Sequence, residues 1–524
     1  MLIISKVATY SIGRGKMLPL ARIAKEVGIV LSGANALYAP VALRRDAELE
    51  VREEDLVLIY DDRFENYYML GVLRWVTRYE PFLRRATHNV YIEHPEALNT
   101  DIVMPFTNAL VEIYAGICDG SPLCGGRQGI DSNIYAPTPS SKVYKLIDAS
   151  LLTKYLAISK AIHVGVHKYS KWRLPLDVHW VPYHIGVFGA TGTGKSRLVL
   201  KLVEELSKAG FNLIVFDHSG VDYVPAAKKL GWEVVDANEI VIPPLVFAQT
   251  ISELMGLSSS STLKDYVDLA TVCYDKLRRG EASNPSTCFQ QVSGVVKSGG
   301  NKVQKYERWD KQLFREVLAI VARRFGARDH TVYKLTVLLD YYVPDYVFET
   351  MNRRSVEPIE LVERALEKHV VVVDLSSERN VEVKRAIVAS IASSVWSIIY
   401  RRLEPIKLGL VIDEAQNYAC EYCGNAAKEL ETVAREGRKW GYFIIVASQR
   451  IAKDIRPGIR SNLGTVFFSR LQSRNDLQEL AGYLDLGRVT EASLAMLSRR
   501  EFYVAGLMNP LRRPLLLHID EVTL

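Results

Sequence analysis

"IGVFGATGTGKS", residues 185–196, is the stretch of sequence that decides the fold. Its second part, Gly189 to Ser196, matches the phosphate-loop pattern G-x-x-x-x-G-K-[ST] in full. Four apolar residues of strand length precede this loop, and the amphipathic run "RLVLKLVEELSKAG" (197–210) follows it. Because a strand, a glycine-rich loop and a helix in this order form a nucleotide-binding unit, the sequence predicts an α/β fold with a phosphate site at the end of the strand.

The loop has the chemistry that binds the phosphates of a nucleotide. Its glycines let the backbone curl so that N–H groups face the phosphates, and the helix N-terminus adds positive potential. We expect the Lys195 ammonium to reach the β- and γ-phosphates and the Ser196 hydroxyl to bind Mg²⁺. The predicted nucleotide site comprises Gly189, Ala190, Thr191, Gly192, Thr193, Gly194, Lys195, Ser196 and Arg197.

A pair of carboxylates ends the apolar run of "LGLVIDEAQ" (408–416). At such a strand end Asp413 would meet Mg²⁺, and Glu414 would polarise the attacking water as a general base. The pair favours hydrolysis over nucleotide sensing alone. The alternative is a strand that ends in helix N-cap residues, but the phosphate loop in the same chain favours the catalytic interpretation.

Two other strand ends carry polar side chains that would lie at the same edge of the sheet. In "LIVFDHSGVDY" (213–223), Asp217 would contact the water shell of the metal, or hold a turn as a purely structural residue. Gln449 ends the run "YFIIVA" (442–447), where its amide would touch the γ-phosphate and report its loss. The alternative for Gln449 is an ordinary strand end that faces solvent.

Basic residues precede this last strand in "VAREGRKWGYFIIVASQR" (433–450). In a ring of subunits, Arg438 or Arg435 would meet the γ-phosphate of the neighbouring subunit, where an arginine is worth about 10³–10⁵ in rate. The alternative is a set of solvated pairs among Glu431, Arg435, Glu436 and Lys439 at helical spacing. The residues alone leave both interpretations open.

The pattern of apolar runs divides the chain into units. From about residue 185 strand-length runs alternate with helical stretches, which predicts a largely parallel sheet covered on both faces. Short runs with a period of two near the start predict strands, with helices expected around 19–28 and 104–116. The predicted domains are a β-rich, barrel-like domain (1–118), a linker and connecting segment (119–160), an α/β core (161–249 and 369–510), a helical insertion (250–368) and a C-terminal tail (511–524).

Length and composition set broad limits. A chain of 524 residues predicts two to four domains. The 66 basic and 60 acidic residues give a charge of +6, which permits nucleic-acid binding without requiring it. We find no signal peptide and no run of roughly 18 apolar residues, so we expect a cytoplasmic protein without membrane insertion.

Six cysteines are too few for a secreted disulfide framework in a chain of this length. Cys420 and Cys423 have the spacing of half a zinc site, but no second half accompanies them. We expect two free thiols, with a local disulfide as the alternative.

Three stretches carry a family resemblance: "HIGVFGATGTGKS" (184–196), "VIDEAQNY" (411–418) and above all "AREGRKWGYFIIVASQR" (434–450). They resemble the HerA branch of the HerA/FtsK translocases, over roughly residues 160–510. The resemblance implies a RecA-like core with a helical insertion and an N-terminal β-barrel. It also implies a homo-hexamer that uses ATP and Mg²⁺ to pump duplex DNA, in archaea often with a NurA-type nuclease in DNA end processing.

The resemblance also implies roles for single residues. Lys195 and Ser196 would bind phosphate and Mg²⁺, with Asp413 supporting the metal and Glu414 as the base. Arg438 is the first choice for the arginine supplied in trans and Arg435 the second, and Gln449 would sense the γ-phosphate.

DNA contacts are the least defined of the expected interactions. The stretch "SQRIAKDIRPGIRSNLG" (448–464) is expected to be a loop, because Pro457-Gly458 breaks a long helix. It would contact backbone phosphates or stay solvated, through Arg450, Lys453, Arg456 and Arg460.

Two other functions are compatible with these motifs. One is a conjugation- or secretion-type ATPase of the same superfamily, and the other is an assembly protein that nucleotide switches without translocation of DNA. The acidic pair Asp413-Glu414 argues against the second.

Overall fold

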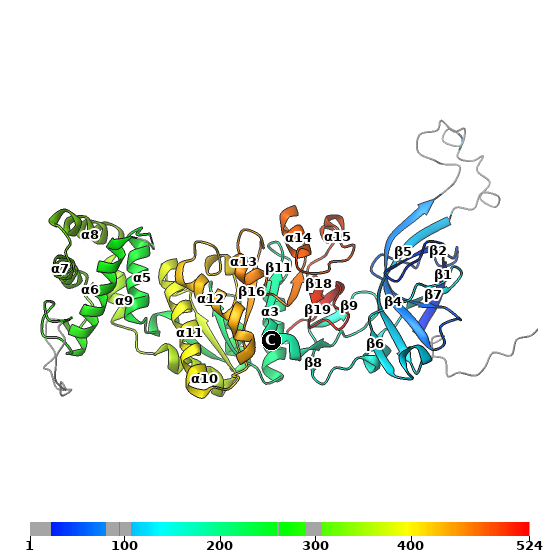
Figure 1. Ribbon diagram of the computed structural model, residues 1–524, viewed down its shortest axis with the longest axis horizontal. Coiled ribbons are helices and arrows are strands. Elements are labelled where there is room, and N and C mark those ends of the chain that lie inside the picture. The colour runs from blue at the N-terminus through cyan, green and yellow to red at the C-terminus, as the bar shows by residue number, and fades with distance from the viewer. Residues whose placement is uncertain (1–22, 80–93, 95–105, 259–260, 290–305, 523–524) are drawn as a thin grey trace, which may run out of the picture.

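The computed structural model describes residues 23–79, 94, 106–258, 261–289 and 306–522. Along the long axis of the molecule lie, in order, a β-barrel, an α/β core and a helical unit (Figure 1). The core occupies the centre, and the other two units contact its opposite ends.

A ten-stranded sheet forms the centre of the core, in the order β13-β14-β12-β15-β16-β11-β17-β18-β19-β9. The strands from β13 to β17 pair in parallel, whereas β18, β19 and β9 pair antiparallel to their neighbours. The strand-length runs at 185–188 and 408–412 are confirmed as strands with those bounds. The strands are β9 Gly165–His167, β11 Ile185–Phe188, β12 Asn212–Asp217, β13 Glu233–Asp236, β14 Val370–Asp374, β15 Leu408–Ile412, β16 Tyr442–Ser448, β17 Thr465–Phe468, β18 Glu501–Gly506 and β19 Leu515–Ile519. A short ribbon of β8 Ala161–Ile162 and β10 Leu176–Asp177 lies beside the sheet.

Helices cover both faces of this sheet, which is why its parallel strands are apolar without alternation. Side chains of α3 and α4 share one hydrophobic cluster with one face of the strands. Side chains of α10, α11 and α12 share another cluster with the opposite face. These helices are α3 Lys195–Lys208, α4 Val224–Leu230, α10 Pro358–Lys368, α11 Val381–Arg402 and α12 Gly424–Glu436, and the short helices after β16 and β17 are α13 Pro457–Arg460, α14 Arg474–Ala481 and α15 Glu491–Ala495.

Helix α11 is long and apolar enough to cross a membrane by length and composition, a candidate that the sequence analysis did not find. Its most apolar window is 72% buried inside the protein. It packs against α5, α10 and α12, so burial in the core accounts for its composition.

The helical unit consists of α5 Pro244–Leu254, α6 Thr262–Arg279, α7 Lys311–Arg324, α8 Asp329–Tyr342 and α9 Asp345–Met351. Ser261 and Asp310 begin α6 and α7 by accepting backbone N–H groups, as N-cap residues do. The unit shares a hydrophobic cluster with α11 and the sheet. Within the predicted insertion 250–368, α10 packs on the core rather than in this unit.

The N-terminal strands form a closed antiparallel barrel. Their order is β2-β1-β7-β3-β4-β5, and pairing of β2 with β5 closes it, while β6 extends β5. The strands are β1 Ala24–Val30, β2 Tyr38–Leu43, β3 Leu56–Tyr60, β4 Tyr67–Tyr79, β5 Phe106–Asp119, β6 Gln128–Asp131 and β7 Lys142–Leu146. The expected barrel-like domain is confirmed, but its last strand lies inside the segment 119–160 that was predicted as a linker.

The helices expected around 19–28 and 104–116 are wrong within the described residues, where β1 and β5 lie instead. Strand β5 is buried on both sides: Val111 and Ile113 face the barrel interior, while Ala115 and Ile117 face the core. Because both faces are apolar, β5 lacks the alternation by which a half-buried strand is recognised.

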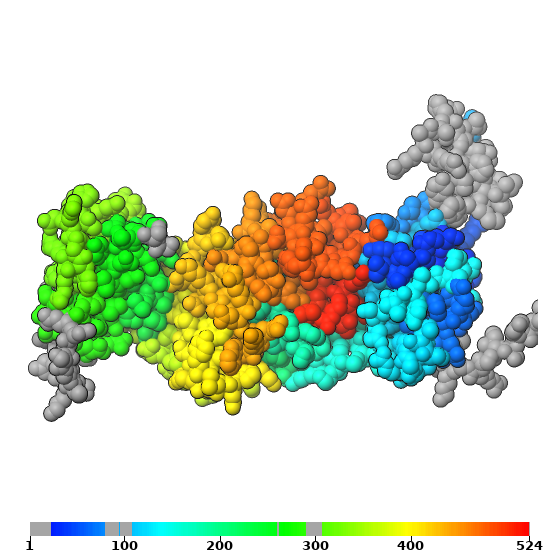
Figure 2. Space-filling view, in the orientation of Figure 1, coloured from blue at the N-terminus to red at the C-terminus, as the bar shows by residue number. Residues whose placement is uncertain are grey.

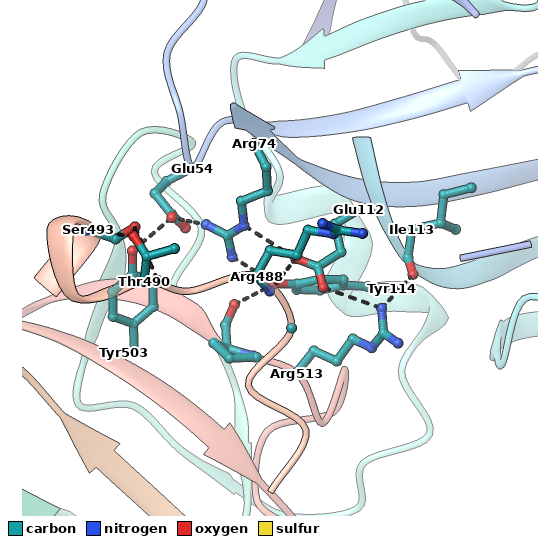
Figure 3. Close-up of polar contacts among 12 residues, drawn as sticks. Glu54, Arg74, Glu112, Ile113, Tyr114, Arg488, Thr490, Ser493, Tyr503 and Arg513 are labelled. Atoms are coloured by element: carbon teal, nitrogen blue, oxygen red, sulfur yellow. Dashed lines mark hydrogen bonds and ion pairs between the residues drawn. The ribbon is translucent and has the colours of Figure 1, made fainter. Parts of the chain in front are cut away.

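A buried polar network joins the barrel to the core (Figure 3). Arg74 of β4 is 2% exposed, forms ion pairs with Glu54 and Glu112, and donates to the Tyr114 hydroxyl at 3.0 Å. From the core, the Tyr503 hydroxyl donates to Glu54 at 2.7 Å. Arg488 and Arg513 of the core approach Glu112, and Tyr114 donates to the Pro514 carbonyl at 2.9 Å. Figure 2 shows the barrel seated against the C-terminal segments that carry these partners.

We expect Arg74→Ala to destabilise the protein by about 3–5 kcal/mol, because it removes the buried guanidinium that pairs with the carboxylates of Glu54 and Glu112. Urea unfolding followed by fluorescence measures the change. Arg44→Ala is the control, since Arg44 pairs with Glu26 and Asp46 at the barrel surface. Equal unfolding midpoints for the two variants would contradict the role of the network.

Candidate functional site

The phosphate loop connects β11 to α3 as predicted. Gly192 and Gly194 have φ values of 80° and 102°, a region that favours glycine, so the loop curls before α3 begins at Lys195. The loop is anchored to neighbouring strands: Gly189 N–H donates to the Ser448 carbonyl and Ala190 N–H to the Arg470 carbonyl. The pattern in the sequence therefore corresponds to a preformed loop at the carboxyl edge of the sheet.

Lys195 is 8% exposed and lies folded onto its own loop. Its Nζ donates to the carbonyls of Gly189 at 2.8 Å and Ala190 at 3.4 Å. Burial lowers the pKa of Lys195, while the carboxylates of Asp413, Glu414 and Asp222 oppose that shift. These carbonyls hold the ammonium beside the place where phosphates bind such a loop.

Asp413 and Glu414 follow β15 directly, two strands from the loop. Asp413 is 4% exposed; its Oδ2 accepts from the Tyr223 hydroxyl at 2.7 Å and its Oδ1 from the Glu414 N–H at 2.8 Å. Burial raises the pKa of Asp413, and hydrogen bonds from Tyr223 and the Ser196 hydroxyl oppose this shift. A buried carboxylate beside a serine hydroxyl is an oxygen set that suits Mg²⁺, so these residues fit the metal.

Glu414 has a left-handed backbone, with φ 49°. Its carboxylate accepts from the Gln416 amide, whose oxygen accepts from Ser448 at 3.0 Å. A non-glycine residue in this conformation is uncommon and is often found at functional sites. The network fixes the Glu414 side chain near the loop.

Asp217 holds the loop that follows β12. Asp217 is 1% exposed, and its carboxylate accepts the N–H groups of Ser219, Gly220, Tyr223 and Val224. These contacts give Asp217 the turn-holding role that was one of its two predicted roles.

Asp222, from the same loop, was missed in the sequence analysis. Burial raises the pKa of its carboxyl, with Asp217 and Glu414 adding to the shift and the Ser196 hydroxyl opposing it. Asp222 stands in "HSGVDY", five residues after the end of β12. Nothing in this stretch of sequence indicated that its carboxylate lies near the Ser196 hydroxyl.

Gln449 lies beside the loop. Its Oε1 accepts from the Thr191 hydroxyl at 3.2 Å and from the Gln472 amide at 3.3 Å. The predicted sensor is thus in contact with the phosphate loop and not merely at a strand end that faces solvent.

Arg435 and Arg438 lie at the opposite edge of the sheet from these residues. Arg435 belongs to α12 and Arg438 to the 3-10 helix Gly437–Trp440, which precedes β16. Seven residues of β16 separate them from Gln449, a distance of about 20 Å along the strand. Neither arginine can reach its own phosphate loop.

The two arginines differ in their partners. Arg435 pairs with Glu431 at 2.5 Å, as the solvated alternative predicted. Arg438 is exposed, stacks over Tyr183 at 4.6 Å and has no carboxylate partner among the residues that the structure describes. This leaves the Arg438 guanidinium, and not that of Arg435, available to an external anion.

His184 holds the segment that carries Arg438. It is 2% exposed; its Nδ1 accepts from the Ile444 N–H at 3.2 Å, so its Nε2 donates to the Ala434 carbonyl at 3.0 Å. Burial lowers the pKa of His184 to about 4. The neutral ring thus ties the end of α12 to β16 at neutral pH.

The predicted basic loop contains the helix α13 Pro457–Arg460. Arg460 pairs with Glu479 and donates to two backbone carbonyls, and Arg456 pairs with Glu431. Arg450 and Lys453 are exposed without a carboxylate partner in the described part of the chain. Two of the four residues therefore remain candidates for phosphate contacts.

The cysteines form three disulfides: Cys118–Cys124, Cys273–Cys288 and Cys420–Cys423. The expectation of free thiols at Cys420 and Cys423 is wrong, and the local disulfide is correct. This disulfide lies between Glu414 and α12, where Arg385 contacts the Cys423 sulfur at 3.4 Å and donates to the Asn417 carbonyl at 2.7 Å. The spacing of Cys420 and Cys423 in the sequence could not distinguish two free thiols from a local disulfide.

Known proteins resemble this chain. Residues 162–395 match the family described as "Helicase HerA, central domain". The chain is 23% identical over 428 residues to the DNA double-strand break repair helicase HerA of Saccharolobus solfataricus, covering 81% of this chain and 78% of that protein. It is 25% identical over 374 residues to the protein of the same name from Sulfurisphaera tokodaii, covering 69% of each. The predicted resemblance to HerA-type proteins is confirmed.

The fold has a solved counterpart in VirB4 of Thermoanaerobacter pseudethanolicus. The TM-score is 0.50 at 17% identity, and the match covers 70% of this chain and 98% of that one. At this identity the likeness concerns the fold, which is that of a P-loop NTPase.

We expect Tyr223→Phe to weaken Mg²⁺ binding by about 10–100-fold, because the Tyr223 hydroxyl orients the carboxylate of Asp413. Titration of Mg²⁺ against ADP binding by calorimetry measures the effect separately from turnover. Tyr418→Phe is the matched control, since that buried hydroxyl contacts His218 instead. Equal Mg²⁺ affinities in both variants and in the wild type would contradict the assignment.

Proposed function

We propose that this chain is an ATP-driven, ring-forming DNA translocase or helicase with a RecA-like core. The observation that carries the proposal is the division of one ATPase site between the two edges of the sheet. Lys195, Ser196, Asp413, Glu414 and Gln449 meet at one edge. Arg438, which has no carboxylate partner within the described part of the chain, lies at the other edge. The two relatives named DNA double-strand break repair helicase HerA support DNA as the substrate.

The residues at the carboxyl edge have separate tasks in hydrolysis. Lys195 would exchange the carbonyls of Gly189 and Ala190 for the β- and γ-phosphates of ATP. Ser196 and Asp413 would hold Mg²⁺, which neutralises charge that develops on the phosphates. Glu414 would accept a proton from the attacking water, and Gln449 would contact the γ-phosphate through the position where it now meets Thr191.

Arg438 would act on the nucleotide of a neighbouring subunit. Subunits in a ring contact each other heterologously, so one edge of a sheet can face the opposite edge of the next. The guanidinium would then neutralise charge on the γ-phosphate in the transition state. We propose a homo-hexamer, as the resemblance implies.

Duplex DNA would pass through the channel of this ring. Arg450 and Lys453 follow Gln449 within four residues, so a change at the γ-phosphate would move groups that contact DNA phosphates. Such contacts carry no sequence information, so binding would be independent of sequence. The names of the relatives support work at DNA double-strand breaks. We propose a NurA-like nuclease as the partner, as the family resemblance implies, and a cytoplasmic location.

The first test is ATP hydrolysis with and without linear duplex DNA. We expect DNA to stimulate turnover severalfold and Glu414→Gln to abolish it, because the amide cannot accept a proton. Turnover indifferent to DNA would instead favour a secretion-type ATPase, and absence of turnover would favour a nucleotide-switched assembly protein.

The second test mixes inactive subunits. Lys195→Ala subunits retain Arg438, and Arg438→Ala subunits retain the phosphate loop, so mixed rings contain some complete sites. We expect each variant alone to lose about 10³-fold or more in rate and their mixture to recover measurable hydrolysis. Arg435→Ala should stay active alone, because Arg435 is paired with Glu431. A mixture as inactive as its components would exclude action in trans.

A further inference from the structure

The disulfide Cys420–Cys423 lies in the segment that joins the acidic pair to helix α12. Glu414 stands at the start of this segment, and Cys423 is the N-cap residue of α12. We propose that this disulfide is a site of thiol–disulfide exchange with a dithiol reductant, and that its reduction slows ATP hydrolysis by displacing Glu414. The proposal rests on the proposed function, because it names a regulation of that same site.

The disulfide is connected to Glu414 through Gln416. The Cys423 sulfur lies 3.4 Å from the Gln416 carbonyl oxygen. The Gln416 side-chain amide donates to the Glu414 carboxylate, and its oxygen accepts from the Ser448 hydroxyl at 3.0 Å. The backbone of Gln416 thus contacts the disulfide, while its side chain holds the proposed general base.

The position of Glu414 depends on such contacts. Its backbone has φ 49°, and a non-glycine residue keeps this conformation only where its surroundings hold it. Arg385 of α11 donates to the Asn417 carbonyl at 2.7 Å and contacts the Cys423 sulfur at 3.4 Å. One guanidinium therefore holds both ends of the segment 417–423. Opening of the disulfide would release this segment and leave Gln416 and Glu414 less firmly placed.

The two sulfurs differ in the way that an exchange reaction requires. Cys423 is fully buried, whereas Cys420 is half-buried, so an incoming thiolate reaches the Cys420 sulfur first. Cys423 is then the leaving group. It lies beside the Arg385 guanidinium and at the N-terminus of a helix of 13 residues, where the positive charge and the helix dipole both stabilise a thiolate.

The exchange takes place in two balanced steps. A thiolate of the reductant attacks the Cys420 sulfur and forms a mixed disulfide, and the electron pair of the broken S–S bond goes to the Cys423 sulfur. The second thiolate of the reductant then attacks the reductant's own sulfur in the mixed disulfide, and Cys420 leaves as a thiolate. The reductant becomes a disulfide, and the protein gains two electrons and two protons. Oxidation follows the same steps in reverse.

A cavity of about 570 Å³ adjoins the disulfide. Glu421 and Tyr422, which stand between the two cysteines, line it together with Arg385. Ser252 of α5 also lines the cavity; it is 1% exposed, and its hydroxyl has no hydrogen-bond partner in the described part of the chain. Because a buried polar group without a partner is unusual, this hydroxyl points to a polar co-reactant that enters the cavity beside the disulfide.

The disulfide Cys273–Cys288 in the helical unit provides an internal comparison. Its cysteines are both buried, at 0% and 5% exposed. The Cys273 sulfur contacts the Pro285 carbonyl and the Cys288 sulfur the Asn284 carbonyl, each at 3.7 Å. A thiolate reaches these sulfurs only when the helical unit opens, so we expect this disulfide to be reduced far more slowly.

The first measurement follows reduction in the full-length wild type, so it does not depend on the folding of a variant. The oxidised protein is incubated with dithiothreitol, thiols are blocked at intervals with iodoacetamide, and mass spectrometry gives the labelled fraction of each cysteine. We expect Cys420 and Cys423 to be labelled at least about tenfold faster than Cys273 and Cys288, because access and the leaving group set the rate.

The second measurement follows hydrolysis before and after selective reduction. We expect reduction to lower kcat about tenfold, which is part of the roughly 10²–10⁴-fold that a well-placed general base contributes. Affinity for the β,γ-imido analogue of ATP should stay unchanged, because Glu414 would act on the attacking water. Reoxidation with the disulfide form of dithiothreitol should restore kcat.

Two variants provide the controls. Replacement of both cysteines by Cys420→Ser and Cys423→Ser should give the rate of the reduced wild type and remove the response to dithiothreitol. Replacement by Cys273→Ser and Cys288→Ser should leave the response as it is in the wild type.

Three results would overturn the proposal. They are equal rates of reduction at the two disulfides, selective reduction of Cys420–Cys423 without a reversible change in kcat, and a response to dithiothreitol that persists after both of these cysteines are replaced. Absence of hydrolysis by the oxidised wild type would instead overturn the proposed function. The labelling rates would still report the exchange in that case, so the two failures are distinguishable.

Discussion

The structure depends on the pairing of β16 with a parallel strand on each side. Its backbone bonds to β15 and to β11, with Ile445 beside Val411 and Ile185. This register fixes the spacing between the acidic pair after β15, Gln449 after β16 and the phosphate loop after β11. The same strand begins at the other edge, where the segment with Arg438 enters it. One length of buried backbone thus sets both the arrangement of the side chains around the phosphate loop and their distance from the Arg438 guanidinium.

One cluster of buried charges lies where the barrel meets the core. Arg74, Glu54 and Glu112 lie between barrel and core at a large desolvation cost, which their mutual pairing offsets only when all partners are present. Replacement of such a network by apolar residues would often be tolerated energetically. Its presence here gives the barrel one position on the core, because a shifted barrel would separate Glu54 from Tyr503 and Glu112 from Arg488 and Arg513.

The sequence allowed prediction of whatever depends on short local patterns. Residues 185–196, 408–414 and 442–449 each combine a continuous apolar run with polar residues at its end, and the structure has strands there. Strand β5 was misjudged because burial on both sides removes alternation, and β7 because a single strand of five residues gives little signal within a loop-rich segment. Side-chain contacts in the loop after β12 could not be predicted from the sequence. Only the folded structure shows that the Asp217 carboxylate accepts four backbone N–H groups and that the Asp222 carboxylate lies near the Ser196 hydroxyl. The disulfide of Cys420 and Cys423 likewise depends on a backbone distance that spacing does not determine.

The antiparallel strands β18 and β19 connect the phosphate loop to the barrel. Their outer ends border the phosphate loop through Arg500 and Glu521, while Tyr503 and Pro514 contact Glu54 and Tyr114 of the barrel. Arg500 and Tyr503 are three residues apart, so the covalent path from the loop to the barrel is shorter than one strand. These contacts fix the barrel to the part of the sheet that adjoins the phosphate loop.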